Sequence, residues 1–294
     1  TSEGFPSISL LISPRGQKIV KDLGLWETFL QKAFPLTGRF RHLPTGDSVF
    51  MPYGKKDWVN YAIDRNTLAD IIFTEAKNTP NISLYSNHQL VSMTQGVLCF
   101  DVNGEIKTFE KGDLLVGADG ANSKVRELMK ESEPSIQIHK EKFSHRYTQV
   151  SLSMDHVPKQ ALHAINIWPR KDHCMVGMPN SKESLKCTLI LPKDVTENSD
   201  SVIKFIQESF PKIYENLKTE NDLKSLRFAD LNIIEMNSYY EAKSNTVLIG
   251  DAAHTILPFM GQGVNLGLED VGVLYEYIIV NKDLHDFSNE RVKQ

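Results

Sequence analysis

The densest group of residues able to do chemistry lies near the C-terminal end of the chain. Residues 247–249 form a short apolar run that is typical of a buried strand, Gly250 ends the run, and Asp251 follows where such a strand leaves its sheet. Ligands of open α/β sheets lie outside the carboxyl ends of the strands, where a carboxylate can accept a hydrogen bond from a ligand hydroxyl. A Gly-Asp pair alone is equally typical of an ordinary strand-ending turn, so the residues after it decide the interpretation.

A chain breaker and a glycine-rich helix start follow Asp251. Pro258 comes first, then Gly261-Gln262-Gly263, and an apolar helix is expected from Val264 to about Val280. Unpaired backbone N–H groups and the helix dipole make a helix N-terminus favourable for anions. We therefore predict one ligand site along this run, with contacts from Gly250, Asp251, Pro258, Gly261, Gln262, Gly263, Val264 and Asn265.

A second segment has a related pattern. A strand is expected at residues 113–118, Asp119-Gly120 follows it, and Ser123 and Arg126 come at the start of the next predicted helix. One interpretation is a contact with the pyrophosphate of a dinucleotide. The other is a helix start that is capped by its own side chains and holds no ligand.

Two arginines lie at predicted helix starts. Arg15 follows an expected strand at 7–13 and opens a helix expected to reach residue 30, with Ser13 as its N-cap and Pro14 in its first turn. Arg65 joins a strand at 58–63 to a helix at 68–76. A cation at a helix start opposes the helix dipole, and the planar guanidinium suits carboxylates and phosphates. An anionic ligand and a solvated surface arginine both remain open for each residue.

The remaining pattern predicts an α/β fold with two interleaved domains. Residues 1–140 and 225–294 form a nucleotide-binding domain, and residues 141–224 form an antiparallel sheet that covers a substrate, to which residues 36–64 can contribute. The expected elements are hairpins at 38–51 and 97–109, strands at 81–84, 88–93, 146–154, 164–168, 174–178 and 185–191, helices at 202–210 and 213–217, and an extended segment at 225–236. The residues after about 280 are polar and receive no element.

Composition excludes several function classes. The chain has 294 residues, 40% of them hydrophobic, and its net charge of −4 indicates no nucleic-acid partner. Its three cysteines and nine histidines show no metal-ligand spacing, and there is no Gly-x-Ser-x-Gly hydrolase motif. No apolar run reaches the roughly 18 residues of a membrane span, so we expect a cytoplasmic protein of unassigned oligomeric state, with a membrane anchor past Gln294 left open.

Several of these stretches resemble a known family. Asp119–Arg126 and Gly250–Asn265 resemble the two flavin fingerprints of the FAD-dependent aromatic hydroxylases, and Ile8–Gly16 and Asn166–Arg170 are similar to the kynurenine 3-monooxygenase branch. The resemblance implies a glutathione-reductase-like FAD/NAD(P)-binding fold with FAD as cofactor and NADPH as co-substrate. It also implies that O2 forms a C4a-hydroperoxyflavin, which hydroxylates an aromatic, carboxylate-bearing, kynurenine-like substrate.

The resemblance also implies roles for single residues. Asp251 would accept a hydrogen bond from the ribityl chain, and the N–H groups from Gly261 to Asn265 would stabilise negative charge on the flavin ring. Arg15, Asp119 and Gly120 would contact FAD as well. Arg65 would hold the substrate carboxylate, and Phe259 and Met260 would line the substrate cavity. This chemistry requires no catalytic base, and none is assigned.

The sequence departs from the family in four places. It lacks the Gly-x-Gly-x-x-Gly loop that holds the ADP part of FAD, so we expect a fragment whose complete form contains that segment and continues past Gln294. Thr79, Met260 and Asn166 replace a tyrosine, an aromatic residue and a histidine of the family. An FAD monooxygenase for another natural product and a non-catalytic flavin-fold binding protein are therefore the alternatives.

Overall fold

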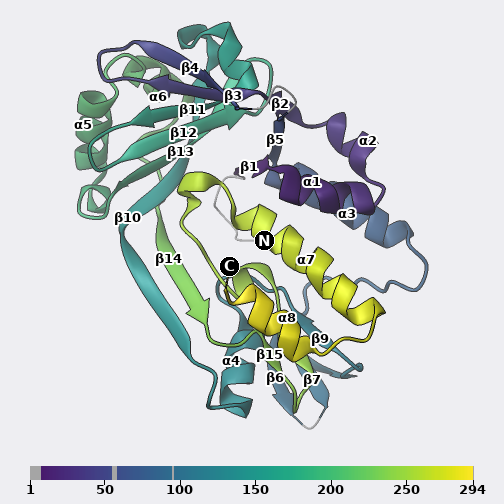
Figure 1. Ribbon diagram of the computed structural model, residues 1–294. Coiled ribbons are helices and arrows are strands. Elements are labelled where there is room, and N and C mark those ends of the chain that lie inside the picture. Colours follow the sequence, from purple (N-terminus) through teal and green to yellow (C-terminus); the bar gives the residue numbers. More distant parts are fainter. Residues whose placement is uncertain (1–7, 55–57, 95, 294) are drawn as a thin grey trace. The chain divides into compact units, whose positions relative to one another are not determined.

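Two compact units, each built from two separate stretches of chain, make up the protein. The computed structural model describes residues 8–54, 58–94 and 96–293 (Figure 1). The first unit combines Thr1–Phe73 with Lys142–Leu231, and the second combines Thr74–Glu141 with Asn232–Gln294. The boundaries fall inside helix α3 (Arg65–Asn78) and strands β10 (Ile138–Ser153) and β14 (Ala229–Met236).

A seven-stranded sheet dominates the first unit. Its order is β14-β10-β13-β12-β11-β3-β4, and its other members are β3 (Gly38–His42), β4 (Ser48–Pro52), β11 (Ala164–Pro169), β12 (Cys174–Pro179) and β13 (Ser184–Pro192). The predicted hairpin β3–β4 is confirmed, as is the antiparallel meander from β11 to β13. The prediction that β10 continues that meander is wrong, because β10 pairs with β13 instead.

Two helices pack their apolar stripes on this sheet. Helices α5 (Ser199–Ser209) and α6 (Tyr214–Glu220) correspond to the two predicted there. Their buried side chains form one core with the inward-facing residues of the strands. That core comprises Val150, Leu152, Trp168, Met175, Leu185, Cys187, Leu189, Leu191, Val202, Ile206, Phe210, Ile213, Leu217 and Leu223. From Ser184 to Leu189, strand β13 alternates half-buried and buried residues, which is the pattern of a strand with one face in the core.

A smaller sheet of the first unit carries the predicted helix starts. It has the order β1-β5-β2, with β1 (Ser9–Ile12), β2 (Phe34–Leu36) and β5 (Asn60–Asp64), and it leads into α3 and into α1 (Pro14–Asp22). The single helix expected up to residue 30 is wrong. Gly24 takes a φ of +71°, which glycine adopts without a steric penalty, so the helix stops and α2 (Trp26–Leu30) begins separately.

The second unit contains two three-stranded sheets. One has the order β15-β16-β9, with β9 (Leu115–Gly117), β15 (Tyr240–Glu241) and β16 (Thr246–Leu248). The other is the meander β6-β7-β8, with β6 (Gln89–Thr94), β7 (Val97–Val102) and β8 (Glu105–Glu110). The hairpin predicted at Asn103-Gly104 is confirmed, since both residues have positive φ as its tight turn requires.

Three helices complete the second unit, and one of them was not predicted. They are α4 (Lys124–Ser132), α7 (Gly263–Ile279) and α8 (Leu284–Arg291). Helix α8 lies after residue 280, in the stretch that the sequence analysis described as polar and to which it assigned no element. The strand predicted at 81–84 is wrong, because these residues form no strand and Asn81 takes a φ of +67°. Short 3-10 turns occur at Met154–His156, Lys159–His163, Val195–Glu197, Gly250–Ala252 and Pro258–Met260.

The compact units divide the chain differently from the predicted domains. Residues 1–73 cluster with the seven-stranded sheet, whereas the sequence analysis assigned 1–140 to the nucleotide-binding domain and allowed residues 36–64 to contribute to the substrate sheet. The physical reason is the parallel pairing of β3 with β11, which ties the N-terminal third to that sheet. No helix of the described ranges has both the length and the apolar composition needed to cross a membrane.

Gly177 on strand β12 lies close to the side chain of Cys187 on β13, and this contact leads to a stability prediction. A Cβ atom at Gly177 would lie 2.6 Å from Cys187 Sγ on β13. Gly177→Ala should therefore lower the free energy of unfolding by about 1–3 kcal/mol through overpacking. Chemical denaturation would measure the loss.

Gly112→Ala is the control, since nothing lies within 4 Å of its added Cβ. Cys187→Ala should rescue part of the stability that Gly177→Ala loses. Equal stability of both glycine variants would contradict the prediction.

Candidate functional site

Two parallel strands bring the two predicted ligand segments of the second unit to one edge of a sheet. Strand β16 pairs in parallel with β9, so that Leu248 lies beside Gly117. The Ile249 N–H donates to the Gly117 carbonyl at 3.0 Å and extends the pairing by one residue. Because parallel strands end at the same edge, the turn at Gly250 and the turn at Gly120 leave the sheet side by side.

The turn after β16 has a conformation that requires glycine. Gly250 takes a φ of +56°, and the α carbon of Gly267 on α7 lies 3.7 Å from the position that a Cβ at Gly250 would occupy. The Gly250 carbonyl accepts hydrogen bonds from the N–H groups of Ala253 and His254, both at 2.9 Å. The turn is therefore a tight 3-10 loop that presses against α7 and projects Asp251 from its outer side.

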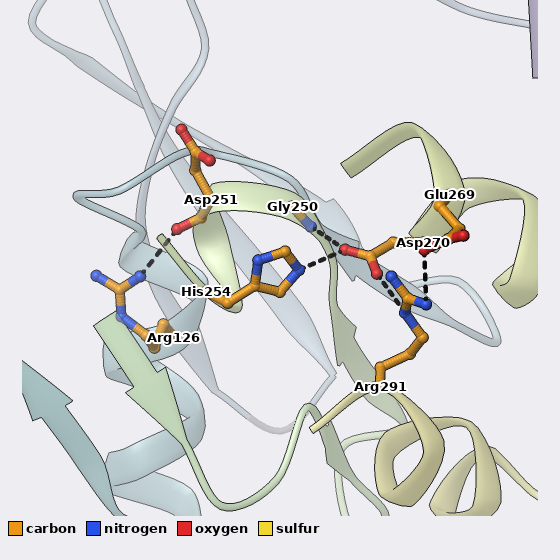
Figure 2. A network of polar contacts seen from close by, with 7 residues as sticks. All are labelled: Arg126, Gly250, Asp251, His254, Glu269, Asp270 and Arg291. Carbon is orange, nitrogen blue, oxygen red and sulfur yellow. Dashed lines mark hydrogen bonds and ion pairs between the residues drawn. The ribbon is translucent and has the colours of Figure 1, made fainter. Parts of the chain in front are cut away.

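A buried carboxylate on α7 holds this turn from within. Asp270 is 1% exposed, and its Oδ2 atom accepts from the Gly250 N–H and from His254 Nε2, both at 2.8 Å (Figure 2). Its Oδ1 atom accepts from Arg291 Nε at 2.6 Å, and Arg291 Nη1 also donates to Glu269 at 3.1 Å. All of these groups belong to the second unit, and together they form one connected polar network.

The two carboxylates of this region differ in their environments. Burial alone would raise the pKa of Asp270, but the His254 hydrogen bond and charge, the Gly250 N–H and Arg291 together hold that pKa below its usual value. Desolvation by the surrounding chain raises the pKa of the Asp251 carboxyl, opposed by nearby His254. Among the described residues, none donates a hydrogen bond to the Asp251 carboxylate, whose accessible oxygens can accept one from a ligand.

Arg126 connects the two turns. Its side chain is fully buried, and Nη1 donates to the Ala252 carbonyl at 2.8 Å and to the Asp251 carbonyl at 3.4 Å. Nη2 donates to the Ala121 carbonyl in the loop after β9. Desolvation lowers the pKa of Arg126, with the charges of Asp119 and Glu127 acting in the opposite direction. The guanidinium thus uses backbone carbonyls of both turns as acceptors, and its role is to fix them to each other.

The loop after β9 contains the helix cap of its second interpretation, and these contacts leave the ligand interpretation open. The Asp119 carboxylate accepts from the N–H groups of Lys124 and Val125, and Ser123 accepts from the Arg126 N–H. These are the contacts of a capped start of α4. Asp119 remains exposed and Gly120 has a φ of +82°, so the loop is open to solvent while its polar groups hold the helix.

The N-terminus of α7 retains the features predicted for an anion site. Gly261 is left-handed with a φ of +61°, and the N-cap residue Gln262 makes no side-chain capping bond to the helix. No acidic side chain lies in the first turn, which contains Gly263, Val264 and Asn265. Asn265 is buried, and its amide donates to the Gly261 carbonyl at 3.0 Å, which fixes the approach to the helix. The N–H groups of a first helical turn have no acceptor within the helical ladder itself, so this end of α7 keeps the geometry predicted for an anion site.

The two arginines of the first unit lie at the helix starts where the sequence placed them. Arg15 is an exposed residue in the first turn of α1, after N-cap Ser13 and Pro14. Arg65 is the first residue of α3; its N–H donates to the Ile8 carbonyl, and its exposed guanidinium forms no ion pair with any described residue. The Asp64 carboxylate caps α3 by accepting from Asn66 N and Thr67 N, which leaves the Arg65 side chain available to a ligand.

The remaining predicted residues have varied environments. Pro258 and Phe259 are exposed on a 3-10 turn before α7, and the side chain of Met260 lies outside what the structure describes. Thr79, a position that departs from the family, follows α3 in the second unit, where its hydroxyl donates to the Glu75 carbonyl. Asn166 is buried on β11, where its Oδ1 lies 3.0 Å from His42 Nε2 and its amide donates to two backbone carbonyls.

Sequence reasoning missed the residues that hold the Gly250 turn. Asp270 is a carboxylate inside a largely apolar helix, and such a residue is rarely buried unless it is paired. That signal was present in the sequence and pointed to a buried partner. Arg291 had no such signal, because it ends a short segment of mostly polar residues to which the sequence analysis assigned no element.

With this geometry in place, comparison with known proteins decides the family. Residues 7–281 match the FAD binding domain family. The chain belongs to this family. The match confirms the resemblance predicted from the two fingerprints, and it confirms FAD as the cofactor to which the fold is suited.

The curated relatives that the chain resembles include several kynurenine 3-monooxygenases. The chain is 30% identical to kynurenine 3-monooxygenase of Anopheles gambiae over 92% of its own length, and 30% identical to that of Sus scrofa over 96%. It is 32% identical to the Cytophaga hutchinsonii enzyme over 92%. The chain spans 58%, 61% and 63% of the lengths of these three relatives.

Solved structures share the fold. The 2-methyl-3-hydroxypyridine-5-carboxylic acid oxygenase aligns with a TM-score of 0.76 at 18% identity, covering 99% of this chain and 76% of its own. PqsL of P. aeruginosa, in complex with 2-aminobenzoylacetate, aligns with a TM-score of 0.78 at 14% identity, covering 98% and 81%. At these identities the likeness confirms the predicted fold class alone.

The position of Arg126 leads to a stability prediction. Arg126→Met should lower the free energy of unfolding by about 2–4 kcal/mol, because buried carbonyls of both turns lose their donor. Chemical denaturation followed by circular dichroism would measure the change. Lys124→Met is the control, since that lysine makes only an exposed 3.4 Å pair with Glu127. A loss no larger than in the control would show that Arg126 does not hold the turns.

Proposed function

We propose that this chain is the flavin-binding part of an FAD- and NADPH-dependent monooxygenase acting on an aromatic, carboxylate-bearing substrate of the kynurenine type. The observation that carries the proposal is the exposed Asp251 carboxylate, placed by a glycine turn at the end of a parallel strand in a chain of the FAD binding domain family. The curated kynurenine 3-monooxygenases support the substrate class.

The residues of the second unit fit a flavin. Asp251 would accept a hydrogen bond from a ribityl hydroxyl, since no described residue satisfies its oxygens. The N–H groups from Gly263 to Asn265 at the start of α7 would favour negative charge on the ring. Asp119 and Gly120 border the same sheet edge and would contact the cofactor from the exposed loop after β9.

The proposed roles of FAD and of the protein follow from these groups. When bound, FAD supplies oxygen activation after reduction by NADPH, and the protein supplies binding and orientation. Arg15 of the first unit would contribute a further FAD contact. Arg65 would hold the substrate carboxylate through its planar fork of donors, and Phe259 and Met260 would line the aromatic ring's cavity. The protein needs no side chain that moves a proton in this scheme.

A second candidate differs in substrate. Thr79 stands where a tyrosine assists substrate binding in the kynurenine branch, and its hydroxyl is engaged by the Glu75 carbonyl. Another aromatic acid of natural-product type is therefore the alternative substrate. A visible absorption spectrum of the purified complete protein, followed by NADPH oxidation with kynurenine and then with other aromatic acids, would separate the two. A folded protein that stays colourless with added FAD would exclude both.

Asp251 provides the first test of the flavin site. Asp251→Ala should raise the Kd for FAD about tenfold or more, because a charge-assisted hydrogen bond to the ribityl chain is lost. Flavin fluorescence titration of the complete protein would measure it. Glu105→Ala removes an exposed carboxylate from β8 of the same unit and should leave the Kd unchanged. Unchanged FAD retention in the Asp251 variant would exclude this role.

Arg65 provides the test of the substrate site. Arg65→Met should raise the KM for the aromatic acid about tenfold or more while FAD content stays the same, because the substrate carboxylate loses a bidentate partner. Steady-state NADPH oxidation would measure KM. Lys77→Met removes another exposed cation from α3 and serves as the control. Loss of FAD from the Arg65 variant would mean that this arginine contacts the cofactor instead.

A further inference from the structure

The last helix of the second unit contributes one buried cation to the polar network. Arg291 ends α8 and is 3% exposed. Its Nε donates to Asp270 Oδ1 at 2.6 Å, and its Nη1 donates to Glu269 Oε2 at 3.1 Å. Figure 2 shows the guanidinium lying against both carboxylates of α7. Arg291 therefore faces two consecutive acidic residues, of which Asp270 is the deeper.

Asp270 connects Arg291 to the glycine turn at Gly250. One of its oxygens faces α8, while the other accepts from the Gly250 N–H and from His254 Nε2, both at 2.8 Å. The Gly250 amide and the His254 ring are thus bound to an atom whose position depends on the Asp270 rotamer. Arg291 holds that rotamer from the opposite side of the same carboxylate.

Helix α8 does not depend on Arg291 alone for its place in the unit. Phe287 is fully buried in a core with Val247, Ile249 and Leu274. Ser288 Oγ accepts from the Tyr239 N–H at 2.8 Å. Truncating Arg291 should therefore leave α8 docked, and the main consequence falls on Asp270, a buried carboxylate deprived of its ion-pair partner.

We propose that Arg291 is a positioning residue that fixes Asp270 and thereby holds the Gly250–Asp251 turn in the conformation that binds FAD. The inference rests on the proposed function in one respect, namely that Asp251 contacts the cofactor. Without Arg291, Asp270 turns away or binds a proton, which breaks or weakens the hydrogen bond from the Gly250 N–H, and Asp251 is no longer presented at a fixed position.

The test uses two readouts on the complete protein. Hydrogen exchange of the Gly250 amide in the FAD-free protein reports the turn itself, and fluorescence titration reports the Kd for FAD. In Arg291→Met, exchange at Gly250 should accelerate about tenfold or more and the Kd for FAD should rise about tenfold.

Arg291→Lys should restore part of both effects, since it returns the charge without the planar fork. Lys293→Met, an exposed neighbour, is the control and should change neither.

Asp270→Asn keeps the proposal falsifiable if Arg291→Met does not fold. The amide has the shape of the carboxylate but lacks its charge, so both readouts should change in the same direction. Unchanged Gly250 exchange in the variants that fold overturns the proposal. Faster exchange with an unchanged Kd for FAD overturns the link between the turn and the cofactor. If the wild-type protein binds no FAD, the proposed function fails, and Gly250 exchange still decides whether Arg291 holds the turn.

Discussion

The arrangement of the candidate flavin site depends on one buried carboxylate. Asp270 would be costly to bury as a lone charge, and the structure offsets that cost with an arginine, a histidine and a backbone N–H. Each partner comes from a different element: α8, the residues after the turn, and the turn itself. The same contacts that make the charge tolerable therefore also fix the relative positions of these three elements.

A second buried charge acts on the other side of the turn. Arg126 donates to backbone carbonyls of both strand-ending loops, and among the described residues it forms no hydrogen bond to a carboxylate. Carbonyl oxygens carry no net charge, so they bind the guanidinium without neutralising it. A positive group therefore lies next to the Asp251 backbone. Together, Arg126 and Asp270 constrain the turn from two directions and leave the Asp251 carboxylate itself accessible.

These contacts explain why several residues have roles in the structure that differ from those predicted from the sequence. One of the two interpretations of the Asp119–Arg126 segment is a pyrophosphate contact, yet the Arg126 guanidinium is fully buried among carbonyls. Asp119 caps α4, and so has a structural task in addition to any contact with a ligand. Asp251 alone combines the predicted position with an exposed carboxylate to which no described residue donates.

Local sequence was sufficient wherever short-range stereochemistry decides the outcome. Asn103-Gly104 specified a hairpin, the apolar run before Gly250 specified a strand with a turn, and the glycines around Gln262 specified an open helix start, since each depends on backbone conformation within a few residues. Only the tertiary structure decided that β3 joins β11, that α8 forms at all, and that Arg291 meets Asp270. Those outcomes depend on pairing and burial between segments distant in sequence, and no local pattern encodes the partner.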